Sequence, residues 1–174
     1  PSLRTRVSFE VGITQCGGTP ITLQQDEVGL GKRESIQDVA QVLSRFVDML
    51  MVRTFSHDTV KTLANYASIP VINGLTDYSH PCQAMADLLT IYENFQTLKG
   101  LRCVYLGDGN NVCRSFMQVS EAFGMHTQVC VPDGHECTGY PHGTDPDKAI
   151  ANAQVIYTDA WVSMGETNKS IDPF

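Results

Sequence analysis

The sequence contains no long apolar run, and none of its hydrophobic stretches approaches the roughly 20 residues that a helix needs to cross a bilayer. It also has no basic-then-apolar leader, no internal repeat and no low-complexity stretch. Its six cysteines, at positions 16, 82, 103, 113, 130 and 137, include no CxxC pair. We therefore expect an intracellular globular chain that is not inserted in a membrane and whose thiols are reduced and mostly buried.

Basic residues are few in this sequence. Its 174 residues hold 12 Lys and Arg against 19 Asp and Glu, which gives a formal net charge of −7. This acidic balance disfavours nucleic acid as a partner, because phosphate backbones bind to basic surfaces. It leaves room for a small anionic substrate that is met by a few focused arginines.

Helical and strand patterns alternate along the chain. Apolar spacing predicts helices over residues 4–14, 36–50, 58–67, 81–92 and 111–123, and strands over 21–23, 49–52, 70–73, 101–106, 127–131 and 154–157. Ser35 followed by Asp38 resembles a capping box, and Pro81 suits the first turn of a helix. The alternation predicts an α/β fold of two domains, each a parallel β-sheet flanked by helices. We place these domains at residues 1–95 and 96–174.

Residues with chemically useful side chains gather at the ends of these predicted elements. The four clusters are SLRTR at 2–6, RTFSH at 53–57, HPCQ at 80–83 and DAWVSMG at 159–165. Ligands of open α/β sheets bind beyond the carboxyl ends of the strands, where such clusters would meet. Ser, Arg and Thr at a helix start form an anion site, because free N–H groups and the helix dipole add to their donors. The pattern predicts a phosphate-bearing substrate.

These clusters and their flanks resemble the aspartate/ornithine carbamoyltransferase family. The matching stretches follow one another in family order over nearly the whole chain, and they are PSLRTRVSFEVG, LGKRESIQDVAQVLSRFVD, VRTFSH, LTDYSHPCQAMADLLTIYE, LKGLRCVYLGDGNNV and YTDAWVSMGE. HPCQ followed by AMADLLTI, with a later DxxxSMG, is similar to the ornithine branch of the family. The resemblance implies a carbamoyltransferase-like α/β fold, incomplete at both ends here. It also implies a homotrimer in the cytoplasm or, in a eukaryote, the mitochondrial matrix.

The resemblance also implies a reaction, in which a carbamoyl group passes from carbamoyl phosphate to the side-chain amine of L-ornithine, giving citrulline and phosphate. No metal or organic cofactor takes part. Carbamoyl phosphate would be bound by Ser2, Arg4, Thr5, Arg53, His80 and Gln83. Arg53, His80 and Thr5 would polarise the carbamoyl carbonyl. Ornithine would be bound in the second domain by Asn111, Asp159, Ser163 and Met164, and domain closure would bring its amine to the carbonyl.

Three features depart from the family pattern. Leu3 stands where the family cradle has a Thr, and Gly29 stands where the family often has Gln or His. The family's HCLP loop and C-terminal helix, expected after SMG, have no counterpart in the 174 residues. We therefore expect these residues to be too few for the complete enzyme. They correspond either to an incomplete stretch of a longer enzyme or to a reduced relative.

Other functions stay open at this point. Leu3 and Gly29 leave room for a catalytically impaired relative that serves as a structural or regulatory subunit. A related carbamoyltransferase could use another amine, such as an acetylated ornithine. GDGNN after a strand is similar to a dinucleotide fingerprint, although its third Gly is missing. A loose group of His and Cys could bind zinc, although the spacing is wider than that of zinc pairs, and its members are His126, Cys130, His135, Cys137 and His142.

Overall fold

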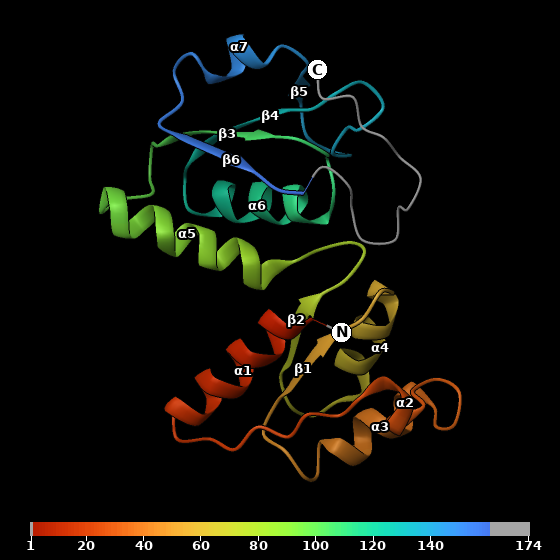
Figure 1. Ribbon diagram of the computed structural model, residues 1–174. Coiled ribbons are helices and arrows are strands. Elements are labelled where there is room, and N and C mark those ends of the chain that lie inside the picture. Colours follow the sequence, from red (N-terminus) through yellow and green to blue (C-terminus); the bar gives the residue numbers. More distant parts are fainter. Residues whose placement is uncertain (1, 161–174) are drawn as a thin grey trace. The chain divides into compact units, whose positions relative to one another are not determined.

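The computed structural model describes residues 2–160 of the chain, which folds into two compact units. One unit comprises Pro1–Val52 and Asp58–Gly74, and the other comprises Arg53–His57 and Leu75–Phe174. The elements labelled in Figure 1 follow in the order α1 (Leu3–Gln15), α2 (Gln25–Val28), α3 (Ile36–Leu43), β1 (Leu50–Arg53), α4 (His57–Tyr66), β2 (Val71–Leu75), α5 (Pro81–Phe95), β3 (Arg102–Leu106), α6 (Asn111–Ala122), β4 (His126–Cys130), β5 (His142–Gly143), α7 (Pro146–Ile150) and β6 (Val155–Thr158).

Strands β1 and β2 pair with each other as a two-stranded sheet. The Leu50 N–H donates to the Pro70 carbonyl at 2.9 Å, and four residues later the Thr54 N–H donates to the Leu75 carbonyl at 3.1 Å. The two bonds advance along both strands together, so the strands run parallel. The carboxyl ends of β1 and β2 therefore lie side by side, and these ends lead into the RTFSH and HPCQ clusters.

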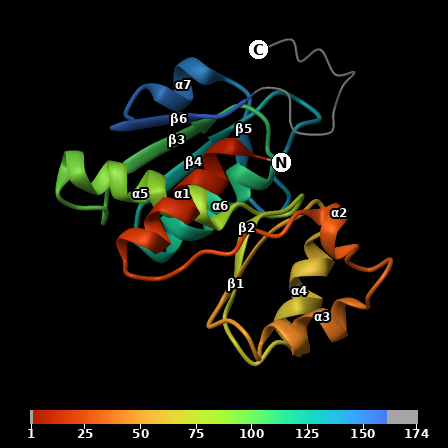
Figure 2. The ribbon, with the colours of Figure 1, turned by 60° about the horizontal axis from the view of Figure 1, so that its bottom comes forward.

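Helices α3 and α4 lie together beside this strand pair in both views (Figures 1 and 2). The Ser44 hydroxyl at the end of α3 accepts the Ser68 N–H, which follows α4, at 3.1 Å. The predicted cap at Ser35 is confirmed, because its hydroxyl accepts the Asp38 N–H at 3.0 Å. The predicted length of this helix is wrong, since α3 ends at Leu43 and the chain turns before β1.

Four strands form the second sheet, in the order β5-β4-β3-β6. Every recorded pairing in it is parallel, as the α/β pattern predicted. Strand β3 lies inside the sheet, and its residues Cys103, Val104 and Tyr105 are at most 2 % exposed. A strand buried on both faces needs helices on both sides of the sheet.

Helices cover the two faces of this sheet, as Figure 2 shows from a second direction. Alternate β3 side chains point to opposite faces, so Cys103 and Tyr105 pack in one cluster with Phe116 of α6. Val104 packs on the other face with Ala149 of α7. Helix α5 lies against α6 and adds Leu88 and Ile91 to the larger cluster.

Two segments differ from the predicted pattern. The strand expected over residues 21–23 is absent, and Ile21 and Leu23 are exposed instead of pairing with a neighbour. Residues 132–152, which show little periodicity, contain the short elements β5 and α7. Asp145 caps α7 by accepting the Lys148 N–H at 3.1 Å. Both elements are too short for an apolar period to be visible in the sequence.

The cysteines are free thiols, and four of the six are buried, as the sequence predicted. Cys16 is exposed and Cys82 is half-buried. Within residues 2–160, no helix combines the length and the apolar character that crossing a membrane requires.

Substituting Gly109 by Ala should lower the free energy of unfolding by about 1–3 kcal/mol, because overpacking against backbone cannot relax cheaply. A Cβ at Gly109 would lie 2.3 Å from the Cys137 nitrogen and 2.4 Å from the His135 carbonyl oxygen. Gly12→Ala is the matched control, since nothing lies within 4 Å of its added Cβ inside α1. That variant should gain about 0.5–1 kcal/mol in helix propensity. Urea unfolding measures both changes, and an equal change in the free energy of unfolding for the two variants would contradict this expectation.

Candidate functional site

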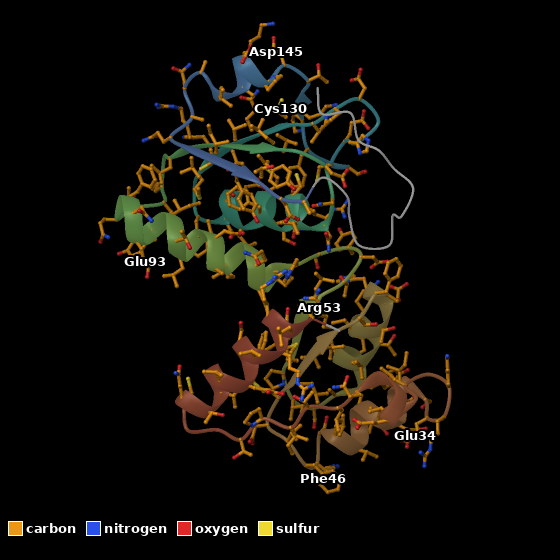
Figure 3. All side chains as sticks on the ribbon, in the orientation of Figure 1. Glu34, Phe46, Arg53, Glu93, Cys130 and Asp145 are labelled. Carbon is orange, nitrogen blue, oxygen red and sulfur yellow. The ribbon has the colours of Figure 1, made fainter. Side chains whose placement is uncertain are left out.

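Arg53 is the last residue of β1 and is labelled in Figure 3. It is half-buried, and this burial lowers the pKa of its guanidinium from the usual value. A guanidinium nevertheless keeps its charge at neutral pH. Strand β1 thus ends in a partly desolvated positive charge.

His80 stands immediately before α5, at its N-cap, where Pro81 begins the helix. Its side chain makes no capping bond, so the imidazole is not used to hold the helix. Burial lowers the pKa of His80, the positive charge of Arg53 lowers it further, and the carboxylates of Asp159 and Asp87 partly oppose this shift. The site therefore holds a neutral imidazole beside a permanent cation.

Gln83 follows His80 by less than one helical turn and is exposed. Its Nε2 donates to the Asp87 Oδ1 at 2.9 Å, so the carboxamide oxygen remains available to accept a bond from a ligand. Asp87 was not among the predicted site residues. The available signal was its position four residues after Gln83 in HPCQAMAD, which puts both side chains on one helix face.

Two buried atoms near this group have no hydrogen-bond partner within residues 2–160, namely the His80 Nδ1 and the Asp87 Oδ2. Buried polar atoms are nearly always paired in folded proteins. Unpaired atoms on both side chains fit a site that is completed by a ligand. Cys82 lies between them in sequence, and burial raises the pKa of its thiol, which keeps it protonated and suits packing instead of nucleophilic attack.

Asn111 and Asp159 belong to the same compact unit as Arg53, His80 and Gln83. Asn111 begins α6 after the Asn110 cap, and its Nδ2 donates to the Thr76 carbonyl at 2.6 Å. Asp159 follows β6, is half-buried, and lies close enough to His80 to influence its protonation. Ser163 and Met164, the other two residues predicted to bind ornithine, lie outside the described residues.

Ser2, Arg4 and Thr5 belong to the other unit, at the start of α1. Ser2 is the N-cap, and its hydroxyl accepts from the Thr5 hydroxyl at 3.2 Å and from the Thr5 N–H at 3.5 Å. A helix therefore begins at these residues, as the sequence predicted. Arg6 is engaged elsewhere, because its Nε pairs with Glu10 at 2.8 Å along α1. The phosphate-binding roles of Ser2, Arg4 and Thr5 stay predictions.

The GDGNN turn is occupied by protein. The Gly109 N–H donates to the His135 carbonyl at 2.8 Å. The backbone of the loop around Cys137 occupies the position that a side chain at residue 109 would need. In a dinucleotide fingerprint a glycine leaves this kind of space for the pyrophosphate. His135 Nδ1 pairs with Asp108 Oδ1 at 3.0 Å. Across residues 2–160, no three His, Cys, Asp or Glu side chains are grouped so as to hold a metal ion.

Gly29 and Leu3, the two departures from the family pattern, occupy clear structural positions. Gly29 has a φ of 61°, and its carbonyl accepts the Lys32 and Arg33 N–H groups at 2.9 and 2.8 Å. A side chain at this left-handed position would also press on Arg33, since an added Cβ would lie 2.9 Å from the Arg33 Cβ. Leu3 lies in the first turn of α1 and is 78 % exposed.

Two sequence models of one family match this chain. The aspartate/ornithine carbamoyltransferase carbamoyl-P binding domain matches residues 1–93, and the Asp/Orn binding domain matches residues 99–173. The ornithine carbamoyltransferase of Symbiobacterium thermophilum is 50 % identical over 182 residues, covering 95 % of this chain and 59 % of the relative. That of Aquifex aeolicus is 44 % identical over 191 residues, covering 100 % and 62 %.

Solved structures agree with these relatives. An ornithine carbamoyltransferase from Pyrococcus furiosus has a TM-score of 0.88 and 45 % identity, covering 96 % of this chain and 58 % of that one. The ornithine carbamoyltransferase of Thermus thermophilus has a TM-score of 0.87 and 43 % identity, covering 92 % of this chain and 58 % of that one. The chain therefore belongs to the aspartate/ornithine carbamoyltransferase family and has its α/β fold. It spans about three-fifths of the length of the relatives it matches.

The lowered pKa of His80 predicts how stability depends on pH. As pH falls below about 7, the unfolded chain takes up a proton near the usual imidazole value of 6.5, whereas the folded chain resists protonation. The free energy of unfolding should therefore fall as pH drops through 6.5 toward the folded-state pKa. His80→Gln should flatten this slope. Denaturant unfolding between pH 8 and 5 would contradict the assignment if this variant kept the full slope of the wild type.

Proposed function

We propose that this chain belongs to an ornithine carbamoyltransferase, which transfers the carbamoyl group of carbamoyl phosphate to the side-chain amine of L-ornithine and releases citrulline and phosphate. The ornithine carbamoyltransferase of Symbiobacterium thermophilum, which is 50 % identical to this chain, supports this proposal. The observation that carries the proposal is the group formed by Arg53, His80 and Gln83. It presents a cation, a neutral imidazole and an amide carbonyl where β1 ends and α5 begins.

The three side chains suit the three parts of carbamoyl phosphate. Arg53 can form charge-assisted bonds with phosphate oxygens and with the carbonyl oxygen. His80, held neutral by burial and by Arg53, can donate an N–H to the same carbonyl oxygen as it gains negative charge. Gln83, whose nitrogen is engaged by Asp87, can accept a bond from the carbamoyl NH2 group with its oxygen.

The acceptor side follows from the same chemistry. The uncharged ornithine amine attacks the carbamoyl carbon, a C–N bond forms, and the C–O bond to phosphate breaks. The attacking nitrogen transfers one proton to the leaving phosphate or to water, and the phosphate leaves with the electrons of the broken C–O bond. Asn111, Asp159, Ser163 and Met164 would hold ornithine. Because only the deprotonated amine can attack, the rate should rise toward alkaline pH.

Several further features belong to this proposal. Ser2, Arg4 and Thr5 would complete the phosphate site, with Thr5 also polarising the carbonyl, and the two domains would span residues 1–95 and 96–174. The reaction would serve arginine metabolism without a metal or organic cofactor. The enzyme would be a homotrimer in the cytoplasm, or in the mitochondrial matrix of a eukaryote. The matches of residues 1–93 to a carbamoyl-P binding domain and of residues 99–173 to an Asp/Orn binding domain support the division into a phosphate-binding and an ornithine-binding domain.

Citrulline formation from radiolabelled carbamoyl phosphate tests the proposal in the intact gene product. Arg53→Ala and His80→Ala should each reduce kcat/KM by about 100-fold or more, the effect of removing a charge-stabilising donor. Arg45→Ala and His126→Gln alter exposed side chains and should retain the wild-type rate.

Two results would contradict this function. A folded wild-type protein that makes no citrulline would indicate a structural or regulatory subunit. Faster turnover of an acetylated ornithine than of ornithine would indicate a carbamoyltransferase for another amine.

Asp87→Asn should raise the KM for carbamoyl phosphate by about 10-fold, the loss expected for one net hydrogen bond. The new amide can donate to the Gln83 oxygen, which turns the Gln83 nitrogen toward the ligand and removes the acceptor for the NH2 group. Asp147→Asn, an exposed change on α7, is the matched control. An unchanged KM in the Asp87 variant would show that Gln83 keeps its orientation without Asp87.

A further inference from the structure

Helix α6 holds the loop that leads into His80, and this inference rests on the proposed function. The Ser115 hydroxyl accepts the His80 backbone N–H at 2.7 Å, across 35 residues of sequence. Asn111 donates from Nδ2 to the Thr76 carbonyl at 2.6 Å. Arg114 donates from Nη1 to the Tyr78 carbonyl at 3.2 Å and places its guanidinium 4.4 Å from the Tyr78 ring centroid.

The loop itself is closed by its own hydrogen bonds. The Thr76 N–H donates to the Ser79 carbonyl at 2.9 Å, and the Ser79 N–H donates to the Thr76 hydroxyl at 3.2 Å. The His57 imidazole also lies within hydrogen-bond distance of the Thr76 hydroxyl, at 3.0 Å. Thr76 and Ser79 are both buried. A loop with this internal closure has little freedom to absorb a change at one end.

Ser115 is fixed between two backbone groups. Its hydroxyl donates to the Asn111 carbonyl at 2.9 Å, which uses its only proton. It can therefore meet the His80 N–H only as an acceptor, and the two bonds are compatible. Ser115 is 2 % exposed, so water does not replace it readily. Removing the hydroxyl would leave the His80 N–H without its acceptor in a desolvated place.

We propose that Ser115 is a positioning residue, which fixes the backbone of His80 and joins it to Asn111. Two hydrogen bonds through one hydroxyl connect a residue assigned to carbamoyl phosphate with a residue assigned to ornithine. A ligand that moves Asn111 then acts on His80, and by linkage a ligand on His80 acts equally on Asn111. Both hydrogen bonds of the hydroxyl go to the protein backbone, so its proposed role is indirect.

The chain offers a matched control on the same helix. Ser120 is 1 % exposed, and its hydroxyl also donates to the carbonyl four residues earlier, that of Phe116. Ser115→Ala and Ser120→Ala therefore remove the same group from the same kind of intrahelical bond. Only the first removes the acceptor of the His80 N–H.

Kinetics on the intact gene product test the positioning role. Ser115→Ala should reduce kcat/KM for carbamoyl phosphate by about 10- to 100-fold, the range expected when a catalytic group is displaced by about 1 Å. Ser115→Thr keeps the hydroxyl and should restore most of this loss, whereas Ser120→Ala should stay close to wild type.

A second measurement tests the link between the sites. Carbamoyl phosphate affinity is measured with and without an ornithine analogue that lacks the side-chain amine. The wild type and Ser120→Ala should share one coupling factor, and Ser115→Ala should bring this factor toward 1. Equal losses in both alanine variants, or a coupling factor unchanged by Ser115→Ala, would overturn the proposal.

Amide hydrogen exchange separates failure of this inference from failure of the proposed function. Ser115→Ala should speed exchange of the His80 N–H in the unliganded protein by at least about 10-fold, and Ser120→Ala should not. This readout needs no turnover. Protection unchanged by Ser115→Ala would overturn the inference even in an active enzyme. A wild type that makes no citrulline but shows the exchange difference would refute the reaction alone.

Discussion

A strand buried on both faces is the constraint on which the second unit depends. β3 places Cys103 and Tyr105 on one side of the sheet and Val104 on the other, each almost fully buried. Both faces must then be covered, by α6 on one side and α7 on the other. Because β3 and β4 run parallel, the chain must return along the sheet between them, and α6 makes this return. Helix α6 therefore begins at the carboxyl end of β3. The residues that begin α6 are positioned as a consequence of this packing.

The candidate site places a positive charge within a chain of net negative charge. A net charge of −7 repels anions at long range, yet Arg53 is partly desolvated, where a charge acts more strongly than it does in water. The same burial keeps His80 neutral, so the two groups stand together without full repulsion. The carboxylates of Asp159 and Asp87 partly oppose the lowering of the His80 pKa. Asp87 also fixes which end of the Gln83 amide faces outward.

Much of the fold follows from local sequence patterns. Apolar spacing marks α5, α6 and β3, and the cap at Ser35 follows from one hydroxyl and the N–H three residues later. The same reasoning failed where local signals are weak or overlap. It extended α3 past Leu43, placed a strand near Ile21, and could not show β5 or α7, whose few residues carry no period.

By itself the sequence determined the family and the α/β order of its elements, and it predicted the side chains that we propose carry the chemistry, including Arg53, His80 and Gln83. These depend on residue identity and on spacing within one element, both of which can be read along the chain. Only the tertiary structure decided which groups support them. The bond between Ser115 and His80 joins residues 35 positions apart, and the shifted pKa of His80 depends on burial and on Arg53. Such contacts arise when separate elements pack together, and no local pattern encodes that step.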